Sequence, residues 1–396
     1  MRPFDDRPVL VVVTGGIAAY KTAYLVRRLR EVGAVVDVVL TRSAERFVGR
    51  ATFEGLTGRP IGTSLWERPL DHIDLGRRAG VAIVAPATAD FLAKLATGQA
   101  DSLAAATLLA APCPVLLCPA MNQRMWKHPA TQRNVDTLRE FGLWMVGPDV
   151  GQLAEGEIGI GRMSEPVEIL AVAGRLLEEQ SLEGRKVVVT AGPTRAPIDP
   201  VRYVGNRASG HMGQALAASA WRRGASVTLV SGPTTRPHPY GPHVIAVDTA
   251  EEMLDALREA LEEADLLLMA AAVSDFRVPS PSDSKIKKTG GDLELHLVAG
   301  PDLLKETRAA RDRRGIVTLG FALETDTPIE NGREKLSSKG VDFMAVNEVG
   351  DPEAGFEVPT NRITLLDRWG EVEELPVLPK EEVADRILDR IEARLD

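Results

Sequence analysis

The sequence predicts two doubly wound α/β domains with mainly parallel sheets, one spanning residues 1–182 and the other 183–396. Short, continuous apolar runs bounded by Gly or Pro alternate with helical segments, a pattern typical of parallel strands that helices cover on both faces. The same alternation restarts near residue 184. A length of 396 residues fits two domains of about 100–200 residues each.

The first domain is expected to open with a strand at 9–14, a Gly15-Gly16 turn and a helix running to about Glu31. The next strand is expected at 35–40, because another apolar run follows a glycine there. Further apolar runs predict strands at 81–85, 114–117 and 144–146.

The second domain repeats this logic with a strand at 186–190, a glycine turn and another strand within 224–230. Thr249 and Glu252 have the spacing of a capping box, which predicts the start of a helix. The remaining expected elements are strands at 266–269, 316–320 and 343–346, a hairpin of 362–366 with 372–377, and a terminal amphipathic helix carrying Val383, Ile387, Ile391 and Leu395.

Composition favours a cytoplasmic enzyme that acts on small molecules. The net charge is −9, whereas nucleic-acid binders usually carry a basic excess. No apolar run approaches the ~18 residues that a membrane span needs, and the start MRPFDDRPVL carries two acids and is no signal peptide. The two cysteines, Cys113 and Cys118, are expected to be reduced core thiols.

The segment 14–22, TGGIAAYKT, nearly matches the phosphate-binding pattern GxxxxGK[ST]. Tyr20 replaces the second glycine, whose turn a bulky residue cannot adopt without strain, so a nucleotide-hydrolysing loop is excluded. Gly15 and Gly16 still join a strand to a helix N-terminus, a place suited to one phosphate. The alternative is a plain turn.

Polar residues follow two further strands, at the edge where open α/β sheets bind ligands. In APATAD (85–90), Thr88 and Asp90 are candidate ligand contacts, although Asp90 is also placed to cap the next helix. In PAMN (119–122), Asn122 offers a donor and an acceptor for a carboxylate or amide; the alternative is an Asx turn.

Two loops complete the first-domain candidates. His72 lies between Asp71 and Asp74, which are placed to tune it as a base, although a lone loop histidine is more often structural. The segment 151–163, GQLAEGEIGIGRM, holds five glycines and is either a mobile flap over a site or a linker.

In the second domain, TAGPTR (190–195) is followed by DPVRYVGNRASGHMG (199–213), which leads into a helix at about 212–223. Ser209 and Gly210 at that helix N-terminus would hold a phosphate or pyrophosphate. Such a long polar stretch has no evident structural role in a buried fold, so it favours a ligand site.

Small residues in AAAVSDF (270–276) allow a ligand to approach closely, and Asp275 is suited to a metal or a sugar hydroxyl. The run KIKK (285–288), with Lys335 and Lys339 four residues apart on one helix face, predicts a triphosphate site. Six of the eleven lysines lie between 285 and 339, in a chain that otherwise prefers Arg. The alternative is chance clustering on a solvated face.

Together these motifs resemble the bacterial bifunctional phosphopantothenoylcysteine decarboxylase/phosphopantothenate–cysteine ligase family of coenzyme A biosynthesis, over essentially the whole chain. The first half resembles flavin-containing cysteine decarboxylases in TGGIAAYK, the His72 loop, APATAD, PAMN and the GxGRM flap. The second half resembles the CTP-dependent ligase in TAGPTR, DPVRYVGNRASGHMG, AAAVSDF, KIKK and GFALET. The resemblance implies Rossmann-like domains.

For the first half, the resemblance implies FMN-dependent decarboxylation to 4′-phosphopantetheine, in which the flavin supplies the redox chemistry. His72 would be the active-site base and Asn122 would hold the substrate carboxylate, while Arg162 and Met163 would belong to the flap. FMN would contact Gly15, Gly16, Ser43, Thr88 and Ala89.

One position departs from the family pattern. The flap usually reads ACGD, and here residues 154–157 read AEGE, so Glu155 replaces the cysteine that protonates the enethiolate intermediate. Neither Cys113 nor Cys118 aligns with that position. We expect Glu155 to serve as the acid, since a buried site can favour a protonated carboxyl group. The alternative is an active ligase whose decarboxylase domain is impaired or altered.

For the second half, the resemblance implies attack of 4′-phosphopantothenate on CTP, then amide formation with cysteine through an acyl-cytidylate. Mg²⁺ would bridge the CTP phosphates, Lys285 would stabilise the α-phosphate and Asn206 would orient the acyl-cytidylate. The nucleotide would also contact Ala271, Asp275, Phe321, Lys335 and Lys339.

The resemblance further implies a homo-oligomer built from trimeric flavin domains and dimeric ligase domains. A nicotinamide-dependent dehydrogenase is the remaining alternative, because folds of this class host one. Its GxGxxG fingerprint is missing at both strand-to-helix turns, so the sequence does not favour it.

Overall fold

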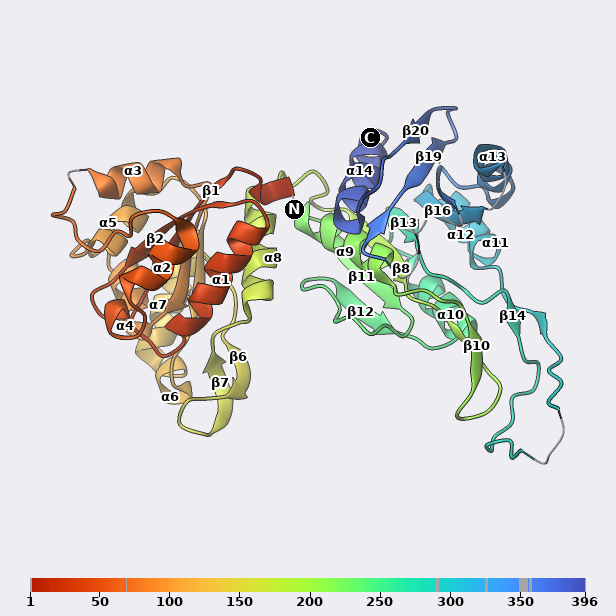
Figure 1. The fold of residues 1–396 in the computed structure, drawn as a ribbon, viewed down its shortest axis with the longest axis horizontal. Coiled ribbons are helices and arrows are strands. Elements are labelled where there is room, and N and C mark those ends of the chain that lie inside the picture. Colours follow the sequence, from red (N-terminus) through yellow and green to blue (C-terminus); the bar gives the residue numbers. More distant parts are fainter. Residues whose placement is uncertain are drawn as a thin grey trace. The chain divides into compact units, whose positions relative to one another are not determined.

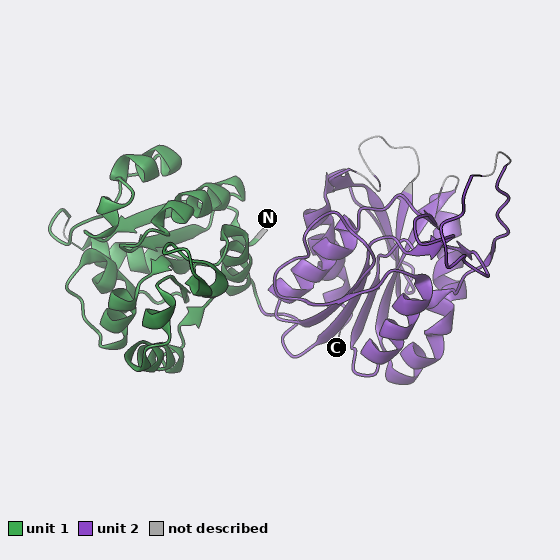
Figure 2. Ribbon diagram, turned by 90° about the horizontal axis from the view of Figure 1, so that it is seen from below, with its two compact units in different colours: residues 1–179 green, residues 180–396 purple. Residues whose placement is uncertain are grey.

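The computed structural model describes residues 2–68, 70–288, 292–324, 327–348, 355 and 358–395. The chain divides into two compact units, residues 1–179 and 180–396 (Figure 2). Each unit has a mainly parallel sheet with helices, which confirms the predicted doubly wound α/β class. Within the described part of the chain, no helix is long and apolar enough to cross a membrane.

The first unit, red to yellow in Figure 1, is built on a five-stranded, entirely parallel sheet. The strand order is β2-β1-β3-β4-β5. Strand β3 is buried along its whole length, as expected for a continuous apolar run. The strands are β1 (Pro8–Val13), β2 (Val35–Leu40), β3 (Val81–Ala87), β4 (Val115–Pro119), β5 (Trp144–Met145) and a separate hairpin of β6 (Asp149–Gln152) and β7 (Ile158–Arg162).

The helices of this unit are α1 (Ala19–Glu31), α2 (Arg50–Thr57), α3 (Asp71–Arg78), α4 (Ala89–Ala96), α5 (Leu103–Ala110), α6 (Gln123–Trp126), α7 (Pro129–Glu140) and α8 (Pro166–Leu177). Strand β1 lies between β2 and β3, so the chain winds outward in both directions from it. In such sheets ligands bind at the carboxyl ends of the strands where the winding direction changes. The loops after β1 and β3 meet at this place.

The second unit has an eight-stranded sheet of order β12-β11-β8-β13-β16-β17-β19-β20. It is parallel from β12 to β17, and the predicted hairpin adds the two antiparallel strands at one edge. Its strands are β8 (Lys186–Ala191), β11 (Ser226–Ser231), β12 (His243–Ala246), β13 (Leu266–Met269), β16 (Val317–Glu324), β17 (Phe343–Glu348), β19 (Ile363–Asp367) and β20 (Val372–Glu374).

Short strands outside this sheet form pairs, of which β9 (Arg195–Pro197) with β10 (Tyr203–Gly205) and β14 (Phe276–Arg277) with β15 (Val298–Ala299) lie near the predicted site motifs. The third pair is β18 (Thr360–Asn361) with β21 (Leu378–Pro379). The helices are α9 (His211–Arg222), α10 (Ala250–Ala260), α11 (Leu303–Glu306), α12 (Arg308–Arg314), α13 (Pro328–Lys339) and α14 (Lys380–Glu392). The winding direction changes at β8, which lies between β11 and β13.

Helices α9 and α14 pack against the sheet of the second unit and share one hydrophobic core with it. The apolar side chains of α14, including Val383, Ile387 and Ile391, are fully buried, as the amphipathic pattern predicts. Helix α9 packs against α14, and Arg222 and Asp385 form a buried ion pair between them. The capping box of Thr249 and Glu252 is formed at the start of α10, because each side chain accepts the other residue's backbone N–H.

Candidate functional site

A cavity of about 1230 Å³ lies at the carboxyl ends of β1, β3 and β4 in the first unit, closed on one side by the β6–β7 hairpin. It gathers side chains from four motifs that are far apart in the sequence. The predicted residues that line it are Gly15, Gly16, Ser43, Thr88, Ala89, Asn122, Glu155, Arg162 and Met163.

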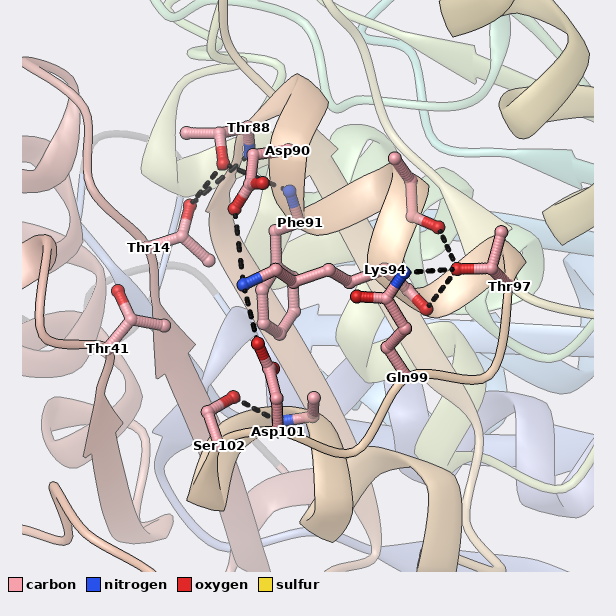
Figure 3. A network of polar contacts seen from close by, with 12 residues as sticks. Thr14, Thr41, Thr88, Asp90, Phe91, Lys94, Thr97, Gln99, Asp101 and Ser102 are labelled. Carbon is pink, nitrogen blue, oxygen red and sulfur yellow. Dashed lines mark hydrogen bonds and ion pairs between the residues drawn. The ribbon is translucent and has the colours of Figure 1, made fainter.

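The floor of this cavity depends on close contact between loops. A Cβ atom at Gly15 would lie 2.3 Å from the Cβ of Ser43, so only glycine permits this approach. The Thr14 hydroxyl accepts the Thr88 backbone N–H at 3.3 Å and donates to the Pro86 carbonyl at 2.6 Å. These bonds join the end of β1 to the end of β3, and Figure 3 shows the contacts between Thr14 and Thr88.

Asn122 and Glu155 meet at one wall of the cavity. The Asn122 side chain accepts the Arg124 backbone N–H at 2.7 Å and so caps α6, while its Nδ2 donates to Glu155 Oε1. The predicted Asx turn and the predicted ligand position are therefore compatible, because one side chain has atoms for both. Glu155 is exposed at the tip of the β6–β7 hairpin, so the burial that was expected to favour its protonated form is not found within one chain.

The flap segment folds as this hairpin rather than as a linker. Its close packing needs glycine at residue 161, where a Cβ atom would lie 2.1 Å from the Met121 carbonyl oxygen. The Met121 backbone N–H in turn donates to the Gly161 carbonyl at 2.9 Å. The hairpin is thereby fixed against the PAMN loop at its base, which leaves Glu155 at the tip over the cavity.

Lys21 fixes the same hairpin from the other side. It is only 8 % exposed, and its Nζ donates to the Met163 carbonyl at 3.0 Å and to Glu165 Oε1 at 2.9 Å. Arg162 also pairs with Glu165. Partial burial acts to raise the pKa of Glu165, but the two cations outweigh it and lower that pKa. Lys21, the lysine of the P-loop-like motif, therefore has a structural role: it ties the start of α1 to the segment after β7.

A second charged group on the wall joins α4 to the start of α5 (Figure 3). Lys94 Nζ lies 3.0 Å from Asp101 Oδ2 and 3.7 Å from Asp90 Oδ2. The hydrogen bond to Asp101 is the largest of the causes that raise the pKa of Lys94. Thr88 caps α4, so the expectation that Asp90 caps it is wrong. Arg42 also lines the cavity, and no described residue forms a hydrogen bond or ion pair with its side chain.

His72 is not brought to this cavity within one chain. It lies in the first turn of α3 and lines a separate hollow of about 460 Å³ with Leu65, Trp66 and Leu109. Trp66 is 92 % exposed, and Leu70, Ile73 and Leu109 are also exposed nearby in the fold. A concentration of exposed apolar side chains is typical of an interaction surface.

Neither cysteine lines the cavity. Both are free thiols, as predicted; Cys118 is fully buried in β4 and Cys113 is half-buried. Burial raises the pKa of both thiols. A protonating group at the cavity therefore has to be something other than a cysteine of this chain.

In the second unit, three predicted motifs meet at the carboxyl ends of β8 and β13. Asn206 Nδ2 donates to the carbonyl oxygens of Ala272 at 3.2 Å and Val273 at 2.9 Å. The Thr190 hydroxyl accepts the Ala271 backbone N–H at 3.1 Å. Asp275 follows in the same loop and is exposed, whereas Phe321 is half-buried on the adjacent strand β16.

The turn before α9 has the geometry of a close backbone approach. Gly210 has a φ of 77°, and a Cβ atom there would lie 3.1 Å from Gly192 and 2.7 Å from Thr234 Cγ2. The Ser209 hydroxyl accepts the His211 backbone N–H at 3.4 Å. Ser209 and Gly210 are therefore placed at the N-terminus of α9 as predicted.

Comparison with known proteins supports both halves of the chain. A family model described as flavoprotein matches residues 2–177, and one described as the C-terminal domain of DNA/pantothenate metabolism flavoproteins matches residues 182–395. A relative from Escherichia coli named coenzyme A biosynthesis bifunctional protein CoaBC is 41 % identical over 398 residues, covering 98 % of each chain. The chain belongs to the CoaBC family.

Other CoaBC relatives match over similar lengths. The protein from Mycobacterium tuberculosis is 45 % identical over 404 residues, covering 97 % of this chain and 96 % of the relative. The protein from Vibrio vulnificus is 39 % identical over 398 residues, covering 99 % of each. The predicted bifunctional ligase and decarboxylase of coenzyme A biosynthesis is confirmed, and the first unit is a flavoprotein domain.

The two α13 lysines of this CoaBC family member already have partners. Lys335 Nζ lies 2.6 Å from Glu324 Oε1, and Lys339 pairs with Asp302. Burial acts to raise the pKa of Asp302, but Lys339 and the helix-capping bond lower it. The motif pattern predicted both lysines but not their carboxylate partners, because Glu324 ends β16 and Asp302 caps α11, both outside the helix that carries the lysines.

Lys285 differs from this pair. Its side chain is exposed, and no described residue forms a hydrogen bond or ion pair with it. Among the described residues, no group of three or more His, Cys, Asp or Glu side chains is arranged to hold a metal ion. Three functional candidates that line the first-unit cavity were not singled out from the sequence: Arg42, Lys94 and Asp101.

Proposed function

We propose that the first unit binds FMN in its cavity and decarboxylates 4′-phosphopantothenoylcysteine. The second unit would form that substrate from 4′-phosphopantothenate, cysteine and CTP. The observation that carries the proposal is the convergence of four first-unit motifs on one cavity at the point where the sheet changes its winding direction. This is where doubly wound sheets bind mononucleotides.

The first-unit residues fit a flavin mononucleotide. The Gly15–Ser43 contact brings the loops after β1 and β2 together at the cavity, just before the N-terminus of α1. Helix N-termini bind phosphate, and the Arg42 guanidinium, which has no partner among the described residues, adds a positive charge beside Ser43. When bound, FMN would supply the redox chemistry that makes loss of carbon dioxide possible.

The chain would supply positioning and a proton. Asn122 would hold the substrate carboxylate through its side-chain amide, which faces the cavity. Glu155 would deliver a proton to the carbon from which carbon dioxide has left, in place of the family's cysteine. The Asn122–Glu155 hydrogen bond supports this role, because it places a carboxyl oxygen beside the group that would orient the leaving carboxylate.

In the second unit, Lys285 would stabilise charge on the α-phosphate of CTP, and Asn206 would orient the acyl-cytidylate. Mg²⁺ would be held by the nucleotide phosphates, and Lys335 and Lys339 would bind the triphosphate after leaving Glu324 and Asp302. Ser209 and Gly210 at the start of α9 are placed for a phosphate. The nucleotide's sugar and base would contact Ala271, Asp275 and Phe321.

A coupled assay tests the function directly. Purified, flavin-loaded protein is given 4′-phosphopantothenate, cysteine, CTP and Mg²⁺, and pyrophosphate and carbon dioxide are followed separately. We expect both products, with pyrophosphate release dependent on CTP. Pyrophosphate without carbon dioxide would mean that the change to Glu155 has silenced the first unit, and absence of both would reject the proposal.

We further propose that the protein works in the cytoplasm as a homo-oligomer, with trimeric flavin domains and dimeric ligase domains. The exposed Trp66 surface and the separation of His72 from the cavity support this assembly, because a neighbouring copy would then supply His72 to the site. The free cysteines fit a reducing compartment.

Subunit mixing tests the shared site. His72→Asn and Asn122→Ala variants are each expected to lose decarboxylation as homo-oligomers. When the two are co-expressed, mixed assemblies that pair an intact His72 with an intact Asn122 are expected to recover part of the activity. If co-expression restores nothing although mixed oligomers are isolated, the two residues do not act across a subunit boundary.

A further inference from the structure

An ion pair between the buried Asp199 and the exposed Arg202 holds the backbone of the loop that carries Lys285. The Asp199 side chain is fully buried and accepts the backbone N–H groups of Val201 at 2.8 Å and Arg202 at 2.9 Å. Arg202 Nη1 donates to Asp199 Oδ2 at 2.6 Å. The same Oδ2 accepts the backbone N–H of Ile286 at 3.1 Å, and the same Nη1 donates to the Ile286 carbonyl at 3.1 Å.

Both polar backbone groups of Ile286 are therefore held by one Asp–Arg pair more than eighty positions away in the sequence. Ile286 directly follows Lys285. The described residues 285–288 show no other hydrogen bond, and the nearest further anchor is the Ser282 backbone N–H, which donates to the Ile198 carbonyl at 2.9 Å. The position of Lys285 thus depends on the bonds that the Asp199–Arg202 pair makes to Ile286.

The charge of Asp199 is stable over the working pH range. Desolvation acts to raise its pKa, but the backbone donors of Val201, Ile286 and Arg202 and the Arg202 guanidinium outweigh it and lower the pKa to about 2. Because this value lies below the ordinary 3.8, the contribution of the pair to stability is present above about pH 4. It is lost only as the pH falls through about 2.

We propose that Asp199 and Arg202 are positioning residues for Lys285, which hold its ammonium group beside the α-phosphate of CTP while the carboxylate is activated as an acyl-cytidylate. The inference rests on the proposed role of Lys285. A flexible lysine pays an entropic cost each time it is ordered, and holding the neighbouring peptide removes part of that cost before the nucleotide arrives. The Asp199–Arg202 pair therefore affects the rate at which the acyl-cytidylate forms.

The principal test is Asp199→Asn in the full-length protein, followed through CTP-dependent pyrophosphate release. We expect kcat to fall by about 100-fold, as for a small misplacement of a catalytic group, with little change in the KM for CTP. Decarboxylation of supplied 4′-phosphopantothenoylcysteine is the internal control, since it occurs in the other unit and is expected to be unchanged. A normal kcat would overturn the proposal.

A matched control comes from an ion pair of the same type and spacing. Asp255 and Arg258 are also three residues apart and bonded at 3.0 Å, but they are exposed on α10 and contact no predicted site residue. Asp255→Asn is expected to leave both activities unchanged. If Asp199→Asn fails to fold, Arg202→Ala and Arg202→Lys replace it. Only the lysine variant is expected to retain most activity, because lysine can still donate to Asp199 Oδ2 and to the Ile286 carbonyl oxygen.

A double-variant cycle separates positioning from a general structural effect. If Asp199 acts through Lys285, the Asp199→Asn/Lys285→Ala protein is no slower than Lys285→Ala alone. Multiplying losses would show that Asp199 acts independently and would reject the proposal. If Lys285→Ala itself leaves pyrophosphate release unchanged, the assigned role of Lys285 fails first, and the positioning proposal fails with it.

Discussion

Replacing Glu155 by Gln is expected to slow carbon dioxide release by about 10²–10⁴-fold, the usual contribution of a general acid. The amide retains the size of the side chain and its hydrogen bond with Asn122 but has no acidic proton to give. Pyrophosphate release in the other unit is expected to be unchanged. The measurement is carbon dioxide release from supplied 4′-phosphopantothenoylcysteine by the flavin-loaded protein.

Glu157 provides the matched control for this variant. It lies two residues away in the same hairpin and is exposed, but it does not line the cavity. Glu157→Gln is therefore expected to leave decarboxylation intact. Equal rates for Glu155→Gln and the unmodified protein would show that the proton comes from another donor, and Glu155→Cys would then report whether the family's usual acid improves the rate.

Replacing Gly213 by Ala is expected to destabilise the second unit by about 1–3 kcal/mol, the usual cost of overpacking a core. The added Cβ atom would lie 2.6 Å from both the Thr190 carbonyl oxygen and the Ala191 Cβ, which forces α9 away from β8. Pyrophosphate release is expected to be lost or strongly reduced, because that displacement moves the Ser209–Gly210 turn. Denaturant unfolding followed by tryptophan fluorescence, to which Trp221 and Trp369 contribute in this unit, measures the change.

The same substitution has the opposite expected sign at Gly55, which serves as the control. Gly55 lies in α2, and a Cβ atom there would have no neighbour within 4 Å. Alanine is favoured over glycine in a helix, so Gly55→Ala is expected to stabilise the first unit by about 0.5–1 kcal/mol. A Gly213→Ala protein as stable as the unmodified one would contradict the close packing of α9 on β8.

The sequence was sufficient to predict every strand of the two main sheets except β12, together with α1, α9, α10 and α14, because continuous apolar runs and capping residues are local signals. The β6–β7 hairpin and helices such as α3, α5 and α7 were not predicted. Strand β2 has its predicted bounds, and the helix after Gly16 ends at Glu31 as expected. Gly15, Gly16, Thr88 and Asn122 were predicted because motifs at the ends of parallel strands meet at one edge of the sheet. The other cavity residues were implied only by the family resemblance: Ser43, Ala89, Glu155, Arg162 and Met163.

Contacts between separate loops could not be predicted in this way. The sequence around His72 did not predict its separation from Asn122, because that separation depends on how α3 packs on the surface. Lys21 matched a phosphate-binding pattern, yet the structure directs it to Glu165, a partner 144 positions away. The carboxylate partners of Lys335 and Lys339 were missed for the same reason.

The ion pairs of α13 affect the net free energy of nucleotide binding in the second unit and its dependence on salt. If Lys335 and Lys339 take up a triphosphate, two internal ion pairs break as two new ones form, so binding is an exchange of anions rather than a simple neutralisation. Added salt weakens both sets of pairs, and the ionic-strength dependence of CTP affinity should be shallower than two free lysines would give. Glu324 and Asp302 also make the lysines selective for highly charged anions. A singly charged anion binds too weakly to displace these carboxylates, whereas a polyphosphate binds strongly enough to displace them.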